Sequence, residues 1–66
     1  MNFTKRLNMI IIKKDLNEKE FAKVCGVSLY KTKKWLKGLS SPYISDLVKI
    51  CKALNVRANW LLGLED

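Results

Sequence analysis

The sequence contains no histidine and only two cysteines, Cys25 and Cys51, which lie far apart in the chain. These residues do not provide the ligand spacing of a zinc site, and without histidine there is no thiol–imidazole pair for covalent catalysis. Both cysteines stand among apolar neighbours at helical spacing, where a free cysteine commonly packs as a small hydrophobic residue. The sequence also lacks a phosphate-binding loop and paired acids suited to a cleft. We therefore expect no metal, no cofactor and no enzymatic activity.

Long hydrophobic stretches are absent as well. The longest clean apolar run, Met9 to Ile12, is far shorter than the roughly 18 to 20 residues that span a bilayer, and no secretory signal pattern opens the chain. A chain of 66 residues has room for one domain and one small hydrophobic core. We expect a single domain over residues 1–66, located in the cytoplasm and without a membrane partner.

Acidic residues are scarce: six Asp and Glu oppose thirteen Lys and Arg, which gives a formal net charge of +7. None of the six lies between Phe21 and Ser45, a stretch that carries five lysines. These are Lys23, Lys31, Lys33, Lys34 and Lys37. So strong a positive field favours a polyanionic partner. A basic surface that is only solvated, or that binds anionic lipid, is the alternative at this point.

Helical periodicity and capping residues divide the chain into five predicted helices. Phe3, Leu7, Ile10 and Ile11 mark the apolar face of the first. The second begins at Glu18, the third covers about 29–37, the fourth about 44–54 and the fifth 57–62. Capping residues support these boundaries: a capping box formed by Asn17 and Glu20, Ser28 before the third helix, and Gly26, Gly38 and Asn55 at helix ends.

The second and third helices, joined by a turn containing Gly26, match a helix-turn-helix motif, in which the second helix of the pair enters the major groove. A helical wheel of the third helix places two kinds of residue on opposite sides. Thr32, Trp35, Leu36 and Leu39 fall on one side, and Tyr30, Lys33, Lys34 and Lys37 on the other. We predict that the first side packs and that the second, basic side binds DNA.

With these residues in place, the chain resembles the Cro and phage-repressor family of helix-turn-helix regulators, also called the Xre-type family. The matching stretches run in the family's order and spacing over nearly the whole chain. They are 16–22, 26–28, Trp35, Gly38, Pro42, 47–56 and 59–63. The resemblance implies an all-α, five-helix, lambda-repressor-like DNA-binding domain that regulates transcription.

Positions that touch DNA in the family can be carried over residue by residue. The resemblance assigns base reading to Leu29, Tyr30, Lys33 and Lys34, and phosphate anchoring to Asn17, Glu18, Lys31, Lys37, Ser40 and Ser41. A lysine at position 34 could donate to guanine O6 and N7. The family often has Gln at position 18, and Arg and Glu at the positions of Ile11 and Leu36. We expect these last two side chains to form an apolar contact instead.

Family members commonly bind pseudo-palindromic operators as two-fold dimers through the fifth helix and the chain end. The resemblance therefore implies a homodimer on double-stranded DNA, with Trp60, Leu61 and Leu64 at the interface, although Trp60 and Leu61 could instead close the core. We expect no small-molecule ligand, because the chain stops soon after Leu64. Two alternatives remain on the same scaffold: a DNA-binding antitoxin paired with a toxin, and a protein-interaction module that does not bind DNA.

Overall fold

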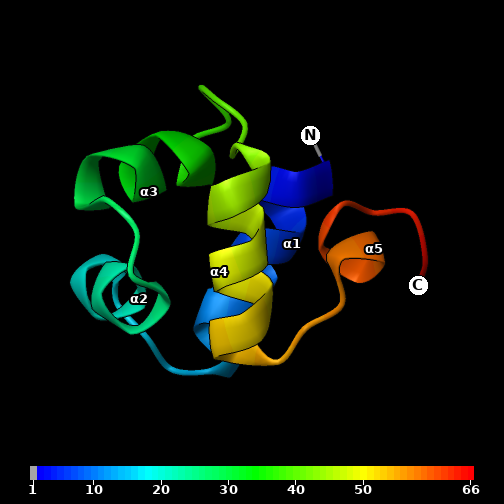
Figure 1. Ribbon diagram of the computed structural model, residues 1–66, viewed down its shortest axis with the longest axis horizontal. Coiled ribbons are helices and arrows are strands. Elements are labelled where there is room, and N and C mark those ends of the chain that lie inside the picture. Colours follow the sequence, from blue (N-terminus) through cyan, green and yellow to red (C-terminus); the bar gives the residue numbers. More distant parts are fainter. Residues whose placement is uncertain (1) are drawn as a thin grey trace.

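The computed structural model describes residues 2–66, and within them the chain forms five α-helices and no β-strand (Figure 1). The helices are α1 (Asn2–Lys13), α2 (Glu18–Cys25), α3 (Leu29–Leu36), α4 (Ile44–Leu54) and α5 (Ala58–Leu61). The predicted all-α fold is confirmed. The predicted start of α2 and both ends of α4 are also correct, whereas α5 is shorter than predicted at each end because residues 57 and 62 are its caps. No described helix is long and apolar enough to cross a membrane.

Each helix is followed closely by a residue with positive φ: Asp15, Gly26, Gly38, Asn55 and Gly63. After each of these residues, the next backbone N–H donates to a carbonyl five positions earlier, as in the bond from Leu39 to Lys34 at 2.9 Å. This pattern satisfies carbonyls that a helix end leaves without partners. The left-handed conformation at Gly26 (φ 70°) and Gly38 (φ 75°) bears no Cβ penalty because glycine has no side chain. The helix ends predicted at Gly26, Gly38 and Asn55 are confirmed.

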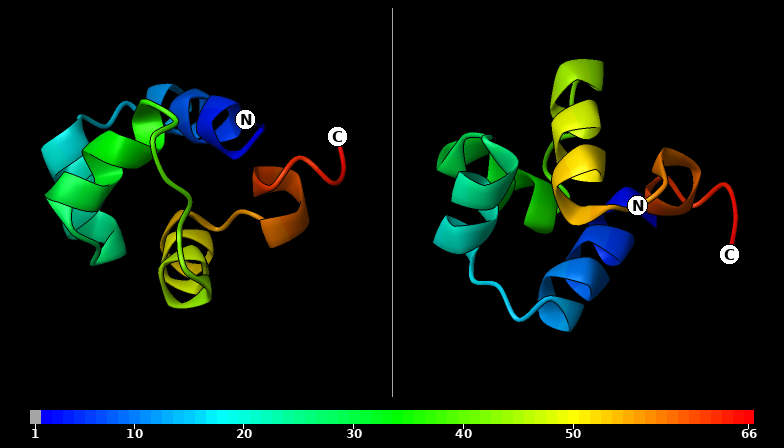
Figure 2. Two further views of the ribbon diagram at one scale, coloured as in Figure 1. Left: turned by 90° about the horizontal axis from the view of Figure 1, so that it is seen from above. Right: turned by 60° about the horizontal axis from the view of Figure 1, so that its bottom comes forward.

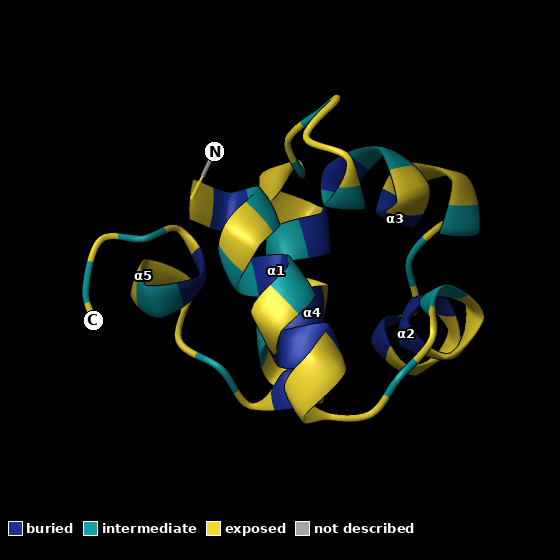
Figure 3. Cartoon of the chain, turned by 180° about the vertical axis from the view of Figure 1, so that it is seen from behind, coloured by how far each residue is buried: buried dark blue, intermediate teal, exposed yellow. Residues whose placement is uncertain are grey.

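The core is built around α1, which contacts both α3 and α5. Side chains from all five helices meet in one apolar cluster, and the buried stripes of the helices face inward (Figure 3). The buried members are Phe3, Leu7, Ile10, Ile11, Phe21, Cys25, Trp35, Ile50, Leu54 and Leu61. The rings of Phe3 and Trp35 pack edge to face with their centroids 6.3 Å apart, a favourable arrangement of aromatic quadrupoles.

Leu39 and Val48 lie on the surface, and Leu39 was expected to pack inward. Leu39 is 69% exposed, because α3 ends at Leu36 and the left-handed Gly38 turns the chain away from the helical wheel on which the expectation was based. Val48 is 44% exposed because the buried stripe of α4 is narrow and passes through Asp46, Ile50 and Leu54.

The helices separate two regions of the surface. The pair α2 and α3 lies at one end of the molecule, and α5 with the C-terminal segment lies at the other, with α1 and α4 between them (Figures 1 and 2). The helix-turn-helix pair and the chain end therefore present different faces to the solvent.

Candidate nucleic-acid interface

Local hydrogen bonds set where α2 and α3 begin. The Asn17 side chain accepts from the backbone N–H of Glu20 at 2.8 Å, and the Glu20 carboxylate accepts from the backbone N–H of Asn17 at 2.9 Å. This reciprocal capping box was predicted and is confirmed. Ser28 Oγ accepts from the backbone N–H of Lys31 at 3.2 Å and caps α3. The first turns of both helices are therefore held by their own sequence.

One side of α3 is fully buried. Thr32 has no exposed surface and Trp35 is 1% exposed. Because the Thr32 hydroxyl is buried, it needs a partner, and it donates to the carbonyl of Ser28 at 2.9 Å. The predicted packing side of α3 is thus confirmed for these two residues.

Two side chains of α1 bond to the C-terminal end of α3. Thr4 Oγ1 donates to the carbonyl of Trp35 at 3.1 Å, and Asn8 Nδ2 donates to the carbonyl of Leu36 at 3.3 Å. The preceding carbonyls, those of Lys33 and Lys34, accept hydrogen bonds from backbone N–H groups of the turn that follows the helix. Because Thr4 and Asn8 are one helical turn apart on α1, the two bonds fix both the position and the direction of α3 relative to the core. We call them the α1 clamp.

The opposite side of α3 is basic and aromatic. Tyr30 is 67% exposed, and the Lys34 ammonium lies 4.8 Å from the centre of the Tyr30 ring. This cation–π contact adds about 0.5 to 1 kcal/mol at an exposed site, so it biases the direction of the Lys34 side chain. Lys33 is exposed on the same helix. The outward side predicted for Tyr30 and Lys33 agrees with their exposure.

A shallow hollow of about 200 Å³ lies between α3, the following loop and the start of α4. It is lined by Tyr30, Lys31, Lys34, Trp35, Ser40, Ser41, Tyr43 and Asp46. The structure thus brings together five residues that the resemblance assigned to DNA contact, three from α3 and two from the loop. Leu29, Lys33 and Lys37 lie outside the hollow, and Asn17 and Glu18 lie at the start of α2.

Two residues of the hollow were not singled out from the sequence. Tyr43 is 74% exposed, and its ring lies 5.5 Å from the Lys31 ammonium. Asp46 is only 7% exposed, and its carboxylate lies 3.3 Å from the same ammonium. The sequence offered one signal, since Asp46 is the acidic residue that ends the acid-free stretch. The sequence could not identify Lys31 as the partner of Asp46, because the two residues lie on different helices separated by a loop.

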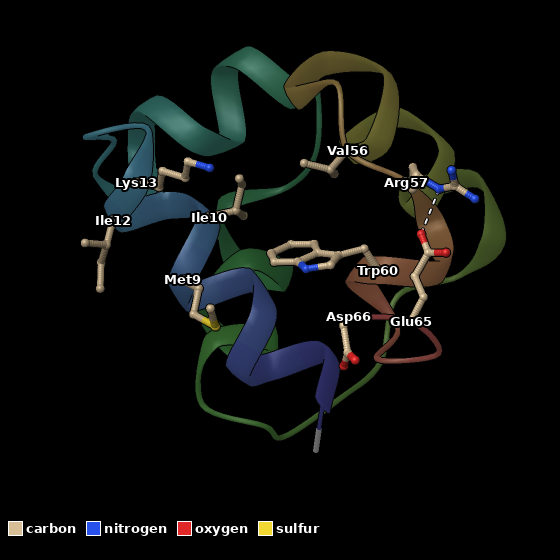
Figure 4. A pocket seen from close by; sticks show the side chains of 9 residues that line it. All are labelled: Met9, Ile10, Ile12, Lys13, Val56, Arg57, Trp60, Glu65 and Asp66. Atoms are coloured by element: carbon tan, nitrogen blue, oxygen red, sulfur yellow. Dashed lines mark ion pairs between the residues drawn. The ribbon is translucent and has the colours of Figure 1, made fainter.

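The chain end forms the second surface of interest. A groove of about 630 Å³ runs between α1 and the C-terminal segment (Figure 4). It is lined by Met9, Ile10, Ile12, Lys13, Val56, Arg57, Trp60, Glu65 and Asp66. Arg57 and Glu65 form an ion pair of 2.7 Å at its edge. The Trp60 side chain points toward α1 in Figure 4, and the Arg6 guanidinium lies 4.8 Å from its ring centre.

The three predicted interface residues differ in exposure. Leu64 is 73% exposed and Trp60 is half-buried, but Leu61 has no exposed surface and belongs to the core. The assignment of Leu61 to the interface is therefore corrected: α5 is a single turn, and its inward position closes the core against α1 and α4.

Both cysteines are free thiols. Cys25 is 5% exposed, and burial raises the pKa of its thiol to about 11. Cys51 packs against the core, and burial raises the pKa of this thiol also. A thiol with a raised pKa is a poor nucleophile at neutral pH, in keeping with the predicted packing function.

Comparison with known proteins agrees with this geometry. The sequence matches the family profile of the Cro/C1-type HTH DNA-binding domain over residues 6–66. Neither the curated proteins nor the solved structures contain a significant match. The profile spans all of α2 to α5 and most of α1, and the two capped helices and the left-handed turn between them form the motif that defines the family. The chain therefore belongs to the Cro/C1-type helix-turn-helix DNA-binding domains, whose members are DNA-binding regulators.

Proposed function

We propose that this protein is a sequence-specific transcriptional regulator that inserts the exposed side of α3 into the major groove of an operator. The observation that carries the proposal is the contrast between the two sides of α3. Thr32 and Trp35 are buried, while Tyr30 and Lys33 are exposed on a helix clamped at its C-terminal end. A rigid basic helix that projects from a core suits groove reading, because side chains specify bases only from a fixed register.

Within this proposal, Lys34 reads a base and Lys37 anchors the backbone. Lys34 lies in the hollow, held over the Tyr30 ring, and can donate to guanine O6 and N7. Tyr30, Leu29 and Lys33 face the neighbouring base edges. Lys37 is the exposed cap of α3, outside the hollow, where it meets a phosphate.

The remaining anchors lie on either side of α3. Ser40 and Ser41 line the hollow and hydrogen-bond phosphate oxygens, and the N-terminal end of α2 at Asn17 and Glu18 directs backbone N–H groups toward the DNA. The capping box already uses the side-chain oxygen and the backbone N–H of Asn17, so the backbone N–H of Glu18 makes the contact at this end.

The experiment that tests these functions compares Lys34→Ala with Lys37→Ala in binding-site selection from random DNA. Loss of Lys34 should relax the preference at one base position and cost about 1 to 3 kcal/mol on the preferred site. Loss of Lys37 should weaken binding to all sequences alike. If the two variants show the same uniform loss, Lys34 does not read a base.

We further propose that the protein binds a pseudo-palindromic site as a homodimer through the chain end. This proposal is supported by Met9 and Ile12, which are 51% and 77% exposed beside the groove, and by the exposed Leu64. Apolar side chains exposed in this way gain from burial against a second copy.

The dimer is tested by sedimentation of the protein alone and in complex with a selected site. Leu64→Asp and Ile12→Asp should give monomers, because each places a charge in the buried interface. Val24→Asp is the matched control, since Val24 is a half-exposed apolar residue on α2, remote from the chain end. A wild-type complex of one protein on an asymmetric site would contradict the dimer.

A further inference from the structure

An ion pair in the hollow joins α3 to α4. Lys31 Nζ lies 3.3 Å from Asp46 Oδ2, and the side chains are 45% and 9% exposed, respectively. Asp46 is the only acidic residue that lines the hollow. The ammonium of Lys31 also lies 5.5 Å from the Tyr43 ring, so two groups on the α4 side hold it.

The two members of this pair respond differently to loss of the partner. Lys31 is nearly half exposed, so water can solvate it if the pair opens. The Asp46 carboxylate is buried and would lose its cationic partner, keeping only the weaker stabilisation from the N-terminal end of α4, which is more costly than breaking an exposed pair. A DNA phosphate that competes for Lys31 must therefore offset this cost in addition to the desolvation of its own oxygens.

We propose that Asp46 is a positioning residue that keeps Lys31 off the DNA backbone. The pair then acts as a neutral brace between α3 and the start of α4, and Lys31 is not a phosphate anchor, contrary to the assignment drawn from the family resemblance. Attraction to the DNA backbone then comes from lysines that form no ion pair within residues 2–66, including Lys33 and Lys37. This inference rests on the DNA-binding function proposed for α3.

The salt dependence of DNA binding distinguishes a braced lysine from an anchoring one. Each phosphate contact on duplex DNA contributes about 0.9 to the slope of log K against log salt concentration. The decisive protein is the double variant K31M/D46N, which removes both charges, leaves the net charge unchanged and leaves no buried charge unpaired. Its slope should equal that of the wild type on a duplex without the operator. The control variant K37M should lose about 0.9 from the slope.

The single variant D46N gives the opposite test, because it releases Lys31 without removing it. Its slope should become steeper by about 0.9, with tighter binding at low salt. Circular dichroism establishes that each variant is folded. If D46N does not fold, the double variant and K37M decide between the outcomes.

Three results would overturn the inference. A loss of about 0.9 in the double variant would show that Lys31 contacts a phosphate. An unchanged slope in a folded D46N variant would show that Asp46 does not keep Lys31 away from the DNA phosphates. If the DNA affinity of the wild type did not depend on salt concentration, both the proposed DNA-binding function of this surface and the inference would fail. If only the inference is wrong, the wild type still shows a normal salt dependence.

Discussion

The α1 clamp makes a quantitative prediction about how α3 is held. Asn8→Ala removes the donor to the Leu36 carbonyl, and Thr4→Val removes the donor to the Trp35 carbonyl while conserving side-chain shape. The Trp35 carbonyl keeps a second donor, the backbone N–H of Gly38 at 3.1 Å. The two substitutions should therefore differ in cost.

The expected losses follow from what each carbonyl retains. Leu36 is half-buried, so its carbonyl loses a bond that water replaces only in part, at a cost of about 1 to 1.5 kcal/mol. The Trp35 carbonyl remains bonded, so Thr4→Val should cost about 0.5 to 1 kcal/mol. The double variant should lose roughly 1.5 to 2.5 kcal/mol, or roughly 10 °C in melting temperature for a domain of this size.

Urea unfolding followed by tryptophan fluorescence measures these losses, because Trp35 is buried beside the clamp. Asn59→Ala is the matched control: Asn59 is an exposed asparagine on α5, and its loss should change stability by less than about 0.5 kcal/mol. Operator affinity of the folded double variant should also fall, since α3 is less firmly oriented. Losses in the clamp variants no larger than in the control would refute the reasoning.

Three further predictions concern packing, backbone and pH. Ile11→Arg and Leu36→Glu should each destabilise by about 2 to 4 kcal/mol, with partial recovery in the double variant; strictly additive unfolding energies would show that these side chains do not meet. Gly38→Ala should lower the free energy of unfolding by about 1 to 2 kcal/mol, measured by thermal unfolding, because an alanine is strained at φ 75°. The new Cβ itself would not clash, since the nearest side-chain atom lies 3.6 Å away. Burial raises the pKa of the Cys25 thiol from 9.0 to about 11, so the contribution of the neutral thiol to folding stability is complete below pH 9 and is lost as the pH rises toward 11. The difference in unfolding free energy between wild type and Cys25→Ala should therefore change between pH 9 and 11, and a constant difference would contradict this prediction.

Much of the fold follows from local sequence. The capping box of Asn17 and Glu20, the cap at Ser28 and the left-handed residues Gly26 and Gly38 each act within a few positions of themselves. Because such interactions need no distant partner, they can be predicted from spacing alone, and the helix boundaries of the motif were predicted to within one residue. The buried stripe of α1 is equally local in origin, since it follows from helical periodicity.

The tertiary structure alone decided which side chains meet across the chain. Asn8 and Leu36 are 28 positions apart, and Lys31 and Asp46 are 15 apart. Spacing carries no information about such pairs, because their distance depends on how whole helices pack. The same reason explains Leu61, whose apolar character suited either a core or an interface until the packing of α5 against α1 and α4 buried it. Local sequence determined where the two helices of the motif begin, and packing determined that Lys31 is the lysine with an acidic partner.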